Sequence, residues 1–427
     1  MSKLKLSIER IKTPGIFAAK LWLKGGSRMD PINKKGLHQL IGSLLSRGCG
    51  PYNHIKLADV VEGCGANLRC DTFEDALLIS IKCLDRDIEK LLPIVGWMIS
   101  SPHMASNQVN LEKDLIIKTL NRQKENPFQV AFDVWRSLAY KDGPYGHDPL
   151  GNIKDLLNIE RSELLSNAKK FKKKTIAIAI AGSFPENIES MILNIEPFNR
   201  QSNFCKVEKK EKENIYITKK INSGDQDIKL QKQNTGQVVI IFGQPTISHR
   251  HKDDLCLRLL SCYCGYGMTS LLFRILREKF GVAYEVGVHH PYREFSTPFI
   301  FHASTSIEKS ELTLELLQEC WWKLSQSKLS NNEVELTKAK FAGQIALSTQ
   351  TVNQRTARSI QLLGLNLPKD YDRKSIEMLN DIKKEDLQEA AINNLNKPLL
   401  SLSGPNKDLE KLKLKWISFK KDISFHY

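Results

Sequence analysis

The chain has no apolar run long enough to cross a bilayer, and its first residues lack the apolar core of a secretion signal. Residues 1–15 are polar. Glu9 interrupts them, and arginine and serine are sparse there, which argues against an organellar transit peptide. These absences predict a protein of the bacterial cytoplasm without a membrane span.

Cysteine pairs at the spacing of a zinc ribbon are also lacking. The nine cysteines include a single C-x-C, formed by Cys262 and Cys264, with no second pair nearby. An odd number of cysteines and the apolar neighbours of Cys83 and Cys256 indicate reduced, mostly buried thiols.

The sequence has no patch of interleaved aromatic and basic residues, although its formal net charge is +15. Apart from the runs 169–174 and 206–212, the lysines are scattered. Charge alone supports a nucleic-acid binder only weakly. Solvated faces and linkers explain the charge better, and a basic surface that faces an acidic partner subunit is the next interpretation.

The most informative part of the sequence is the stretch 265–284. A glycine-rich turn precedes an amphipathic helix predicted over Met268–Lys279, and Gly281 ends this helix after two cationic residues. A strand is predicted from Val282 to His289. Arg277 at the end of the helix and Tyr284 on the strand would therefore offer two strong hydrogen-bond donors to one space.

The order of predicted elements occurs twice along the 427 residues: strand, helices, strand pair, helices, strand. We therefore expect an α+β fold with two similar domains in tandem. The domains are predicted at 1–200 and 236–427, with a polar linker over 201–235. Within them, single helices are predicted over 111–124, 127–140, 153–171 and 352–363.

The layout resembles the insulinase/pitrilysin family of zinc metallopeptidases, in particular its short two-domain branch with the mitochondrial processing peptidases and their bacterial relatives. The resemblance covers nearly the whole chain and depends on the order of several short motifs. They are Leu21-Trp22-Leu23-Lys24-Gly25-Gly26-Ser27-Arg28, Gly36-Leu37-His38, Asn126-Pro127-Phe128, Pro144-Tyr145-Gly146 and the stretch from Met268 to Tyr284. The family implies a mainly antiparallel sheet with packed helices in each domain, and a cavity that the domains or a partner enclose.

The family's zinc motif, H-x-x-E-H on the first helix, is degenerate in this chain. His38 remains, but Ile41 stands at the position of the general base and Gly42 at that of the second histidine. The third ligand should end an E-x-x-x-x-x-x-E pattern that begins at Glu112, and Thr119 stands there instead. The resemblance therefore implies no catalytic zinc, no cofactor in this chain and no peptidase activity alone.

Arg277 and Tyr284 match the arginine and tyrosine with which active relatives contact the substrate peptide near the scissile carbonyl. The resemblance implies a zinc-free subunit that binds peptide and supplies this pair to a homologous partner with an intact H-x-x-E-H motif. The isolated chain is also a possible homodimer.

Other interpretations of the same residues remain open. Arg277 and Tyr284 have a structural alternative, since a helix-terminal arginine offsets the helix dipole and tyrosine is common in strands. His38 is better explained as a hydrogen-bonded core histidine than as a ligand. Two histidine pairs, His249 with His251 and His289 with His290, could suggest a metal site, but they are interpreted as surface or strand histidines because the sequence shows no acidic or cysteine companion at ligand spacing. For the whole chain, the alternative function is a catalytically dead scaffold or binding protein of the same fold.

Overall fold

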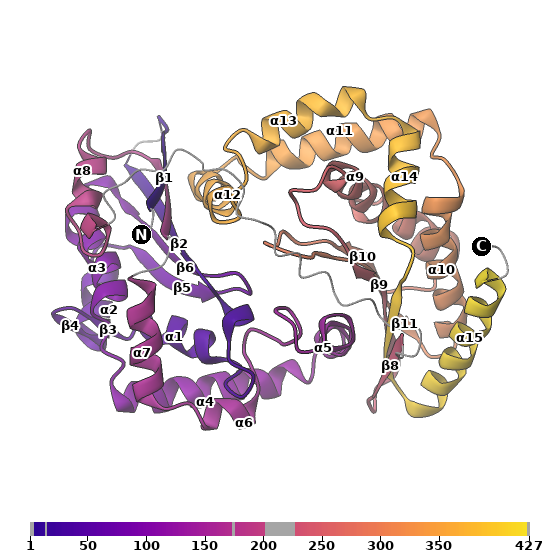
Figure 1. Cartoon of the computed structure of the whole chain (residues 1–427), viewed down its shortest axis with the longest axis horizontal. Coiled ribbons are helices and arrows are strands. Elements are labelled where there is room, and N and C mark those ends of the chain that lie inside the picture. The colour runs from indigo at the N-terminus through magenta and orange to yellow at the C-terminus, as the bar shows by residue number, and fades with distance from the viewer. Residues whose placement is uncertain (1–3, 13–14, 173–175, 201–226, 425–427) are drawn as a thin grey trace. The chain divides into compact units, whose positions relative to one another are not determined.

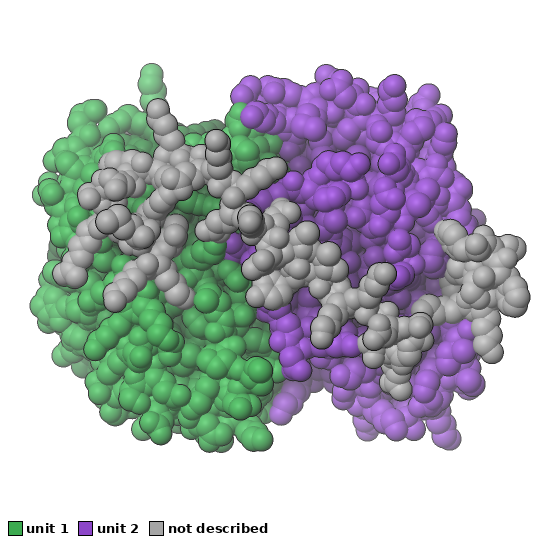
Figure 2. Space-filling model, in the orientation of Figure 1, with its two compact units in different colours: residues 1–121, 147–213, 345–372 green, residues 122–146, 214–344, 373–427 purple. Residues whose placement is uncertain are grey.

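The computed structural model describes the chain except for residues 1–3, 13–14, 173–175, 201–226 and 425–427. Its described residues form two compact units, drawn in green and purple in Figure 2. Unit 1 comprises residues 1–121, 147–213 and 345–372, and unit 2 comprises residues 122–146, 214–344 and 373–427.

Unit 1 is built on a five-stranded sheet with the strand order β1-β7-β2-β6-β5. The β1 and β7 strands are parallel and the other neighbours are antiparallel. The strands are β1 (Leu4–Arg10), β2 (Ile16–Lys24), β5 (Asn67–Thr72), β6 (Ala76–Leu84) and β7 (Ile176–Gly182). A two-stranded ribbon is formed by β3 (Gly48–Cys49) and β4 (Tyr52–Asn53).

Helices cover both faces of this sheet (Figure 1). They are α1 (Leu37–Leu45), α2 (His54–Gly63), α3 (Ile88–Ser100), α4 (Ser106–Gln123), α6 (Ile153–Leu157), α7 (Arg161–Phe171), α8 (Ile188–Leu193) and α12 (Val352–Gly364). Alternate residues of β7 point to opposite faces. Ile176 and Ile178 enter the large core with α1, α3 and α7, whereas Ala177 and Ala179 pack against α12.

Unit 2 repeats this topology, with the strand order β10-β11-β9-β12-β8 and one parallel pair, β8 with β12. Its strands are β8 (Ile228–Lys232), β9 (Gln237–Pro245), β10 (Glu285–His289), β11 (Pro298–Ser306) and β12 (Leu399–Gly404). Its helices are α5 (Pro127–Tyr140), α9 (Asp254–Gly265), α10 (Ser310–Gln326), α11 (Asn331–Leu347), α13 (Tyr371–Glu377), α14 (Lys384–Asn394) and α15 (Asn406–Ser424), with a π-helix over Phe273–Lys279. The equal topology of the two sheets confirms the predicted α+β fold with two similar domains.

Each unit contains one helix from the other half of the sequence. In unit 2, Phe132 and Trp135 of α5 pack with Val239 and Ile241 of the sheet, and the Trp135 Nε1 donates to the Gly243 carbonyl at 3.2 Å. In unit 1, α12 packs on β2 and β7. The compact units thus differ from the contiguous ranges 1–200 and 236–427 by this exchange of helices.

Several elements differ from those predicted from sequence. The range 153–171 contains two helices, because Glu160 caps α7 in a capping box with Glu163. Most of the predicted linker, residues 201–226, lies outside the described residues, but its last part includes β8. Strand β8 is polar because it is the edge strand beside β12, so only part of its surface is covered. The strand predicted from Val282 begins at Glu285.

Within the described residues, no helix has both the length and the apolar character of a membrane-spanning segment.

Candidate functional site

The 265–284 segment begins where α9 ends. A side chain at Gly265 would place its Cβ 2.8 Å from Val288, so glycine allows α9 to approach β10 closely. Gly267 has a positive φ of 78° and nothing within 4 Å of an added Cβ. The first glycine therefore serves tight packing, and the second serves the turn that leads to Arg277.

Arg277 lies on a π-helix, where sequence periodicity predicts an α-helix over Met268–Lys279. Residues 273–279 have π geometry, and the Phe280 N–H donates to the Ile275 carbonyl five residues earlier. Gly281 (φ 57°) then reverses the chain, and the Val282 N–H closes the turn on the Leu276 carbonyl at 2.8 Å. Single π turns inside helices occur frequently at functional sites, because the extra residue redirects side chains.

The Arg277 guanidinium is exposed and lies 5.1 Å from the centroid of the Phe273 ring. It forms no ion pair with a described residue. Tyr284 is 69% exposed, and its backbone N–H donates to the Ser304 carbonyl at 2.8 Å, which holds the residue beside β11. Its hydroxyl has no hydrogen-bond partner among the described side chains. Both residues belong to unit 2 and hold their polar ends in solvent rather than in a core.

Large apolar side chains of the same segment are also exposed. Met268 is 71% exposed, and Tyr266 and Phe280 are exposed by 38% and 41%. Exposed aromatic and methionine side chains are enriched where proteins bind peptides or other proteins. The segment thus carries hydrogen-bond donors and apolar contact area together.

The first helix of the chain, α1, begins at a buried carboxylate. Asp30 accepts hydrogen bonds from the N–H groups of Gly36 (2.7 Å) and His38 (3.0 Å). The same carboxylate contacts Nδ1 of His38 at 2.7 Å and Nε2 of His147 at 3.2 Å. Burial raises the pKa of Asp30, but the hydrogen bonds from His147 and His38 outweigh it and hold the pKa below its ordinary value.

His38 is 4% exposed and is held by Asp30 and by an edge-on contact with Phe171. This environment agrees with the interpretation of His38 as a hydrogen-bonded core histidine. Ile41 is fully buried in the core of unit 1.

Gly42 lies so close to the sheet that an added Cβ would be 2.4 Å from Thr72 Oγ1. Packing therefore leaves no room for a side chain at the position of the family's second histidine. In this chain the position also lacks a metal-binding side chain.

The position of the family's third zinc ligand is no more suitable for metal binding than position 42. Thr119 lies on an exposed face of α4, and its hydroxyl donates to the Leu115 carbonyl one turn earlier at 2.9 Å. Glu112, at the start of the same pattern, is buried and forms an ion pair with Arg47 at 2.6 Å. An isoleucine, a glycine and a threonine offer none of the nitrogen, sulfur or carboxylate ligands that zinc takes. The residues of this motif do not fit the family's catalytic metal.

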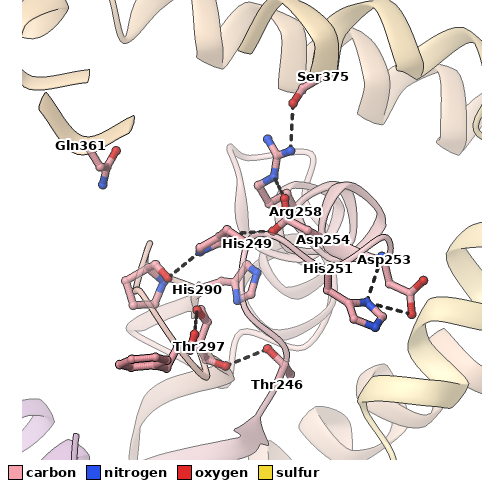
Figure 3. A network of polar contacts seen from close by, with 12 residues as sticks. Thr246, His249, His251, Asp253, Asp254, Arg258, His290, Thr297, Gln361 and Ser375 are labelled. Atoms are coloured by element: carbon pink, nitrogen blue, oxygen red, sulfur yellow. Dashed lines mark hydrogen bonds and ion pairs between the residues drawn. The ribbon is translucent and has the colours of Figure 1, made fainter. Parts of the chain in front are cut away.

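A second group of histidines lies in unit 2 and differs from its sequence-based interpretation. His249 and His290 do have an acidic companion, Asp254, and all three residues are largely enclosed (Figure 3). Burial lowers the pKa of His290 to about 3, so its imidazole is neutral at physiological pH. The sequence did not reveal this group, because His290 is far from the other two residues along the chain.

Comparison with known proteins identifies the class. Residues 8–152 match the family model described as insulinase (peptidase family M16), and residues 158–341 match the model described as peptidase M16 inactive domain. The chain belongs to this two-domain insulinase family. The description of the second model and the degenerate zinc motif support a catalytically inactive member of this family.

Among curated relatives, an "uncharacterized zinc protease" of Rickettsia felis is 24% identical over 95% of this chain and 97% of its own length. A "non-peptidase homolog YmxG" of Helicobacter pylori is 21% identical over 86% of this chain and 83% of its own. The mouse "mitochondrial-processing peptidase subunit beta" is 20% identical over 57% of this chain and 49% of its own. A solved structure of a "peptidase M16 inactive domain" from Pseudomonas fluorescens has a TM-score of 0.82 at 20% identity, with 95% of this chain and 96% of that chain covered.

Proposed function

We propose that this chain is the zinc-free subunit of a heterodimeric insulinase-family metallopeptidase. In this proposal it binds the peptide substrate and supplies Arg277 and Tyr284 to the zinc site of a homologous partner with an intact H-x-x-E-H motif. The observation that carries the proposal is the contrast between the zinc-motif residues in unit 1 and the pair Arg277 and Tyr284 in unit 2. The zinc motif is closed around Gly42, whereas Arg277 and Tyr284 are exposed without ion-pair or hydroxyl partners among the described residues.

The proposed role of the pair is hydrogen bonding to the peptide. A guanidinium and a phenol hydroxyl are strong donors, and donors aimed at a scissile carbonyl stabilise the negative charge that develops on its oxygen. They also hold the peptide in a fixed orientation. The water-activating metal belongs to the partner, and no group at positions 38, 41, 42 and 119 of this chain replaces it.

The structural alternative for Arg277 is weakened by its environment. An arginine that only stabilises a helix end needs no particular neighbours, but here the backbone around it departs from α-helical geometry and exposed aromatic residues accompany it. The mouse relative is named as a subunit, which supports an assembly of more than one chain. The cytoplasmic location remains a prediction from the sequence.

The experiment is reconstitution. A homologous H-x-x-E-H chain is purified alone and with this chain, and cleavage of a fluorogenic peptide library is measured. The proposal predicts no cleavage by this chain, little by the partner, and a large gain for the mixture together with co-elution of the two chains.

A scaffold or binding protein of the same fold is the competing function. The name of the Helicobacter pylori relative, a non-peptidase homologue, favours it. This alternative predicts stable association, with the partner or with a second copy of this chain, and no gain in proteolysis. Association without cleavage in the reconstituted mixture would therefore contradict the composite site.

A further inference from the structure

The three residues His249, Asp254 and His290 of unit 2 come from separate elements and meet in the interior (Figure 3). His249 precedes α9, Asp254 is the first residue of α9, and His290 follows β10. One potential ligand atom of each residue lies within 4.8 Å of those of the other two. His249 and Asp254 are 4% and 5% exposed.

Backbone carbonyls fix which nitrogen of each imidazole carries a proton. The His249 Nε2 lies 3.2 Å from the Pro291 carbonyl, and the His290 Nδ1 lies 2.9 Å from the Pro298 carbonyl. A carbonyl only accepts, so both of these nitrogens are donors. In the neutral form of each imidazole, the lone pair is then on Nδ1 of His249 and on Nε2 of His290. Metal-binding histidines typically use this pattern, in which the second ring nitrogen donates to a carbonyl or carboxylate.

The remaining contacts of the group involve His249 Nδ1, the two oxygens of Asp254 and His290 Nε2. His249 Nδ1 lies 2.5 Å from Asp254 Oδ1, which is the separation of a short hydrogen bond, so these two atoms share a proton that a bound metal ion would displace as the atoms move apart. The other oxygen of Asp254 accepts from the Arg258 Nε at 2.9 Å, and Arg258 in turn donates to Ser375. His290 Nε2 is a buried nitrogen atom that has no hydrogen-bond partner among the described residues.

We propose that His249, Asp254 and His290 bind a divalent transition-metal ion, with zinc as the expected occupant. Two imidazole nitrogens and one carboxylate oxygen select zinc and similar ions over magnesium and calcium, which prefer oxygen alone. The positive charge of Arg258 opposes a cation, so the expected affinity is about micromolar rather than that of a structural zinc finger. Because the group is enclosed, the ion has a structural role and ties the loops before α9 and after β10 to that helix. This site is independent of the proposed function.

The test uses the full chain without an affinity tag, stripped with a chelator and titrated with zinc by calorimetry. The wild-type chain should bind one equivalent and melt at a higher temperature with zinc than with chelator. His290→Gln keeps a donor for the Pro298 carbonyl but removes the imidazole, and Asp254→Asn removes the charge. Each should weaken zinc binding by more than the roughly 10- to 100-fold that loss of an outer-shell partner causes.

His251→Gln is the matched control. His251 is a neighbour in sequence, but its side chain is 42% exposed and it contacts Asp253 instead of the group. This variant should bind zinc like the wild type, and magnesium should not bind to either. Metal-free melting and far-UV circular dichroism establish that each variant is folded.

Three results would overturn the proposal. They are no zinc binding by the wild-type chain, equal binding by the wild-type chain and the folded His290→Gln and Asp254→Asn variants, or equal loss in His251→Gln. Without binding, the position between His249 and Asp254 belongs to a shared proton. A further variant, His38→Gln, separates this site from the degenerate motif. Zinc that is lost only in His38→Gln would contradict the zinc-free proposal instead.

Discussion

The contact between Gly42 and Thr72 gives a prediction that tests why the zinc motif is closed. We consider the smallest enlargement, Gly42→Ala in helix α1. Its Cβ would lie 2.4 Å from Thr72 Oγ1 and 3.3 Å from Leu77 Cδ2. Alanine is favoured over glycine in a helix by about 1 kcal/mol, so an unobstructed site would be stabilised. Overpacking a close contact costs about 1–3 kcal/mol, and a separation of 2.4 Å belongs to the upper part of that range.

We therefore expect Gly42→Ala to lower the free energy of unfolding of unit 1 by about 1–2 kcal/mol. In a Thr72→Ala background the nearest atom is gone, and the same substitution should become neutral or stabilising by about 1 kcal/mol. The assay is a double-mutant cycle in urea, with hydrogen exchange of peptides from residues 37–45 as a local measure. Stabilisation by Gly42→Ala alone, or an effect that Thr72→Ala leaves unchanged, would refute the reasoning. The same contact explains why restoring glutamate and histidine at positions 41 and 42 should not restore a zinc site.

Two further predictions concern buried ionisable groups. Asp30→Ala removes the acceptor of two backbone N–H groups and two imidazoles. It should lower the free energy of unfolding in urea by about 2–4 kcal/mol. An effect below about 1 kcal/mol would contradict the capping role of Asp30. Because the folded pKa of Asp30 is lowered, its contribution is present above its unfolded pKa and is lost as the pH falls through the lower folded value. Burial lowers the pKa of His302, so its unfolded form binds a proton first and stability should decrease below about pH 6.5, by at most about 1.4 kcal/mol per pH unit. His302→Gln should remove this part of the dependence, and an unchanged pH profile would show that His302 does not cause it.

The sequence predicted those parts of the fold whose pattern is local. Apolar runs marked β2, β7 and β9, and helical periodicity marked α1, α5 and α12. It did not reveal β1 and β8, because each is an edge strand beside a parallel partner and carries polar residues. A helical pattern shows that α5 and α12 need an apolar partner but not which sheet provides it, and the exchange between units depends on that choice.

The candidate site was predicted to a similar degree. The identities at positions 38, 41, 42 and 119 are visible in the sequence, and so is the arginine and tyrosine pair. The closure of Gly42 against Thr72 is a distance between elements and has no local signal. The π geometry around Arg277 also escaped prediction, because apolar residues at spacings of three and four fit an α-helix equally well. The group in unit 2 required the fold to bring His290 to Asp254.

The central claim is that Arg277 acts at a partner's zinc site, and the most direct measurement compares two arginines of one helix. Arg274 lies in the same π-helix with its side chain 46% exposed and a loose 3.8 Å ion pair with Glu333. In the reconstituted mixture, Arg277→Ala should lower kcat by about 100- to 1,000-fold, the usual effect of losing an oxyanion donor. Arg274→Ala should change it by less than about threefold, which is under 1 kcal/mol. Equal cleavage rates with the two variants would contradict the account.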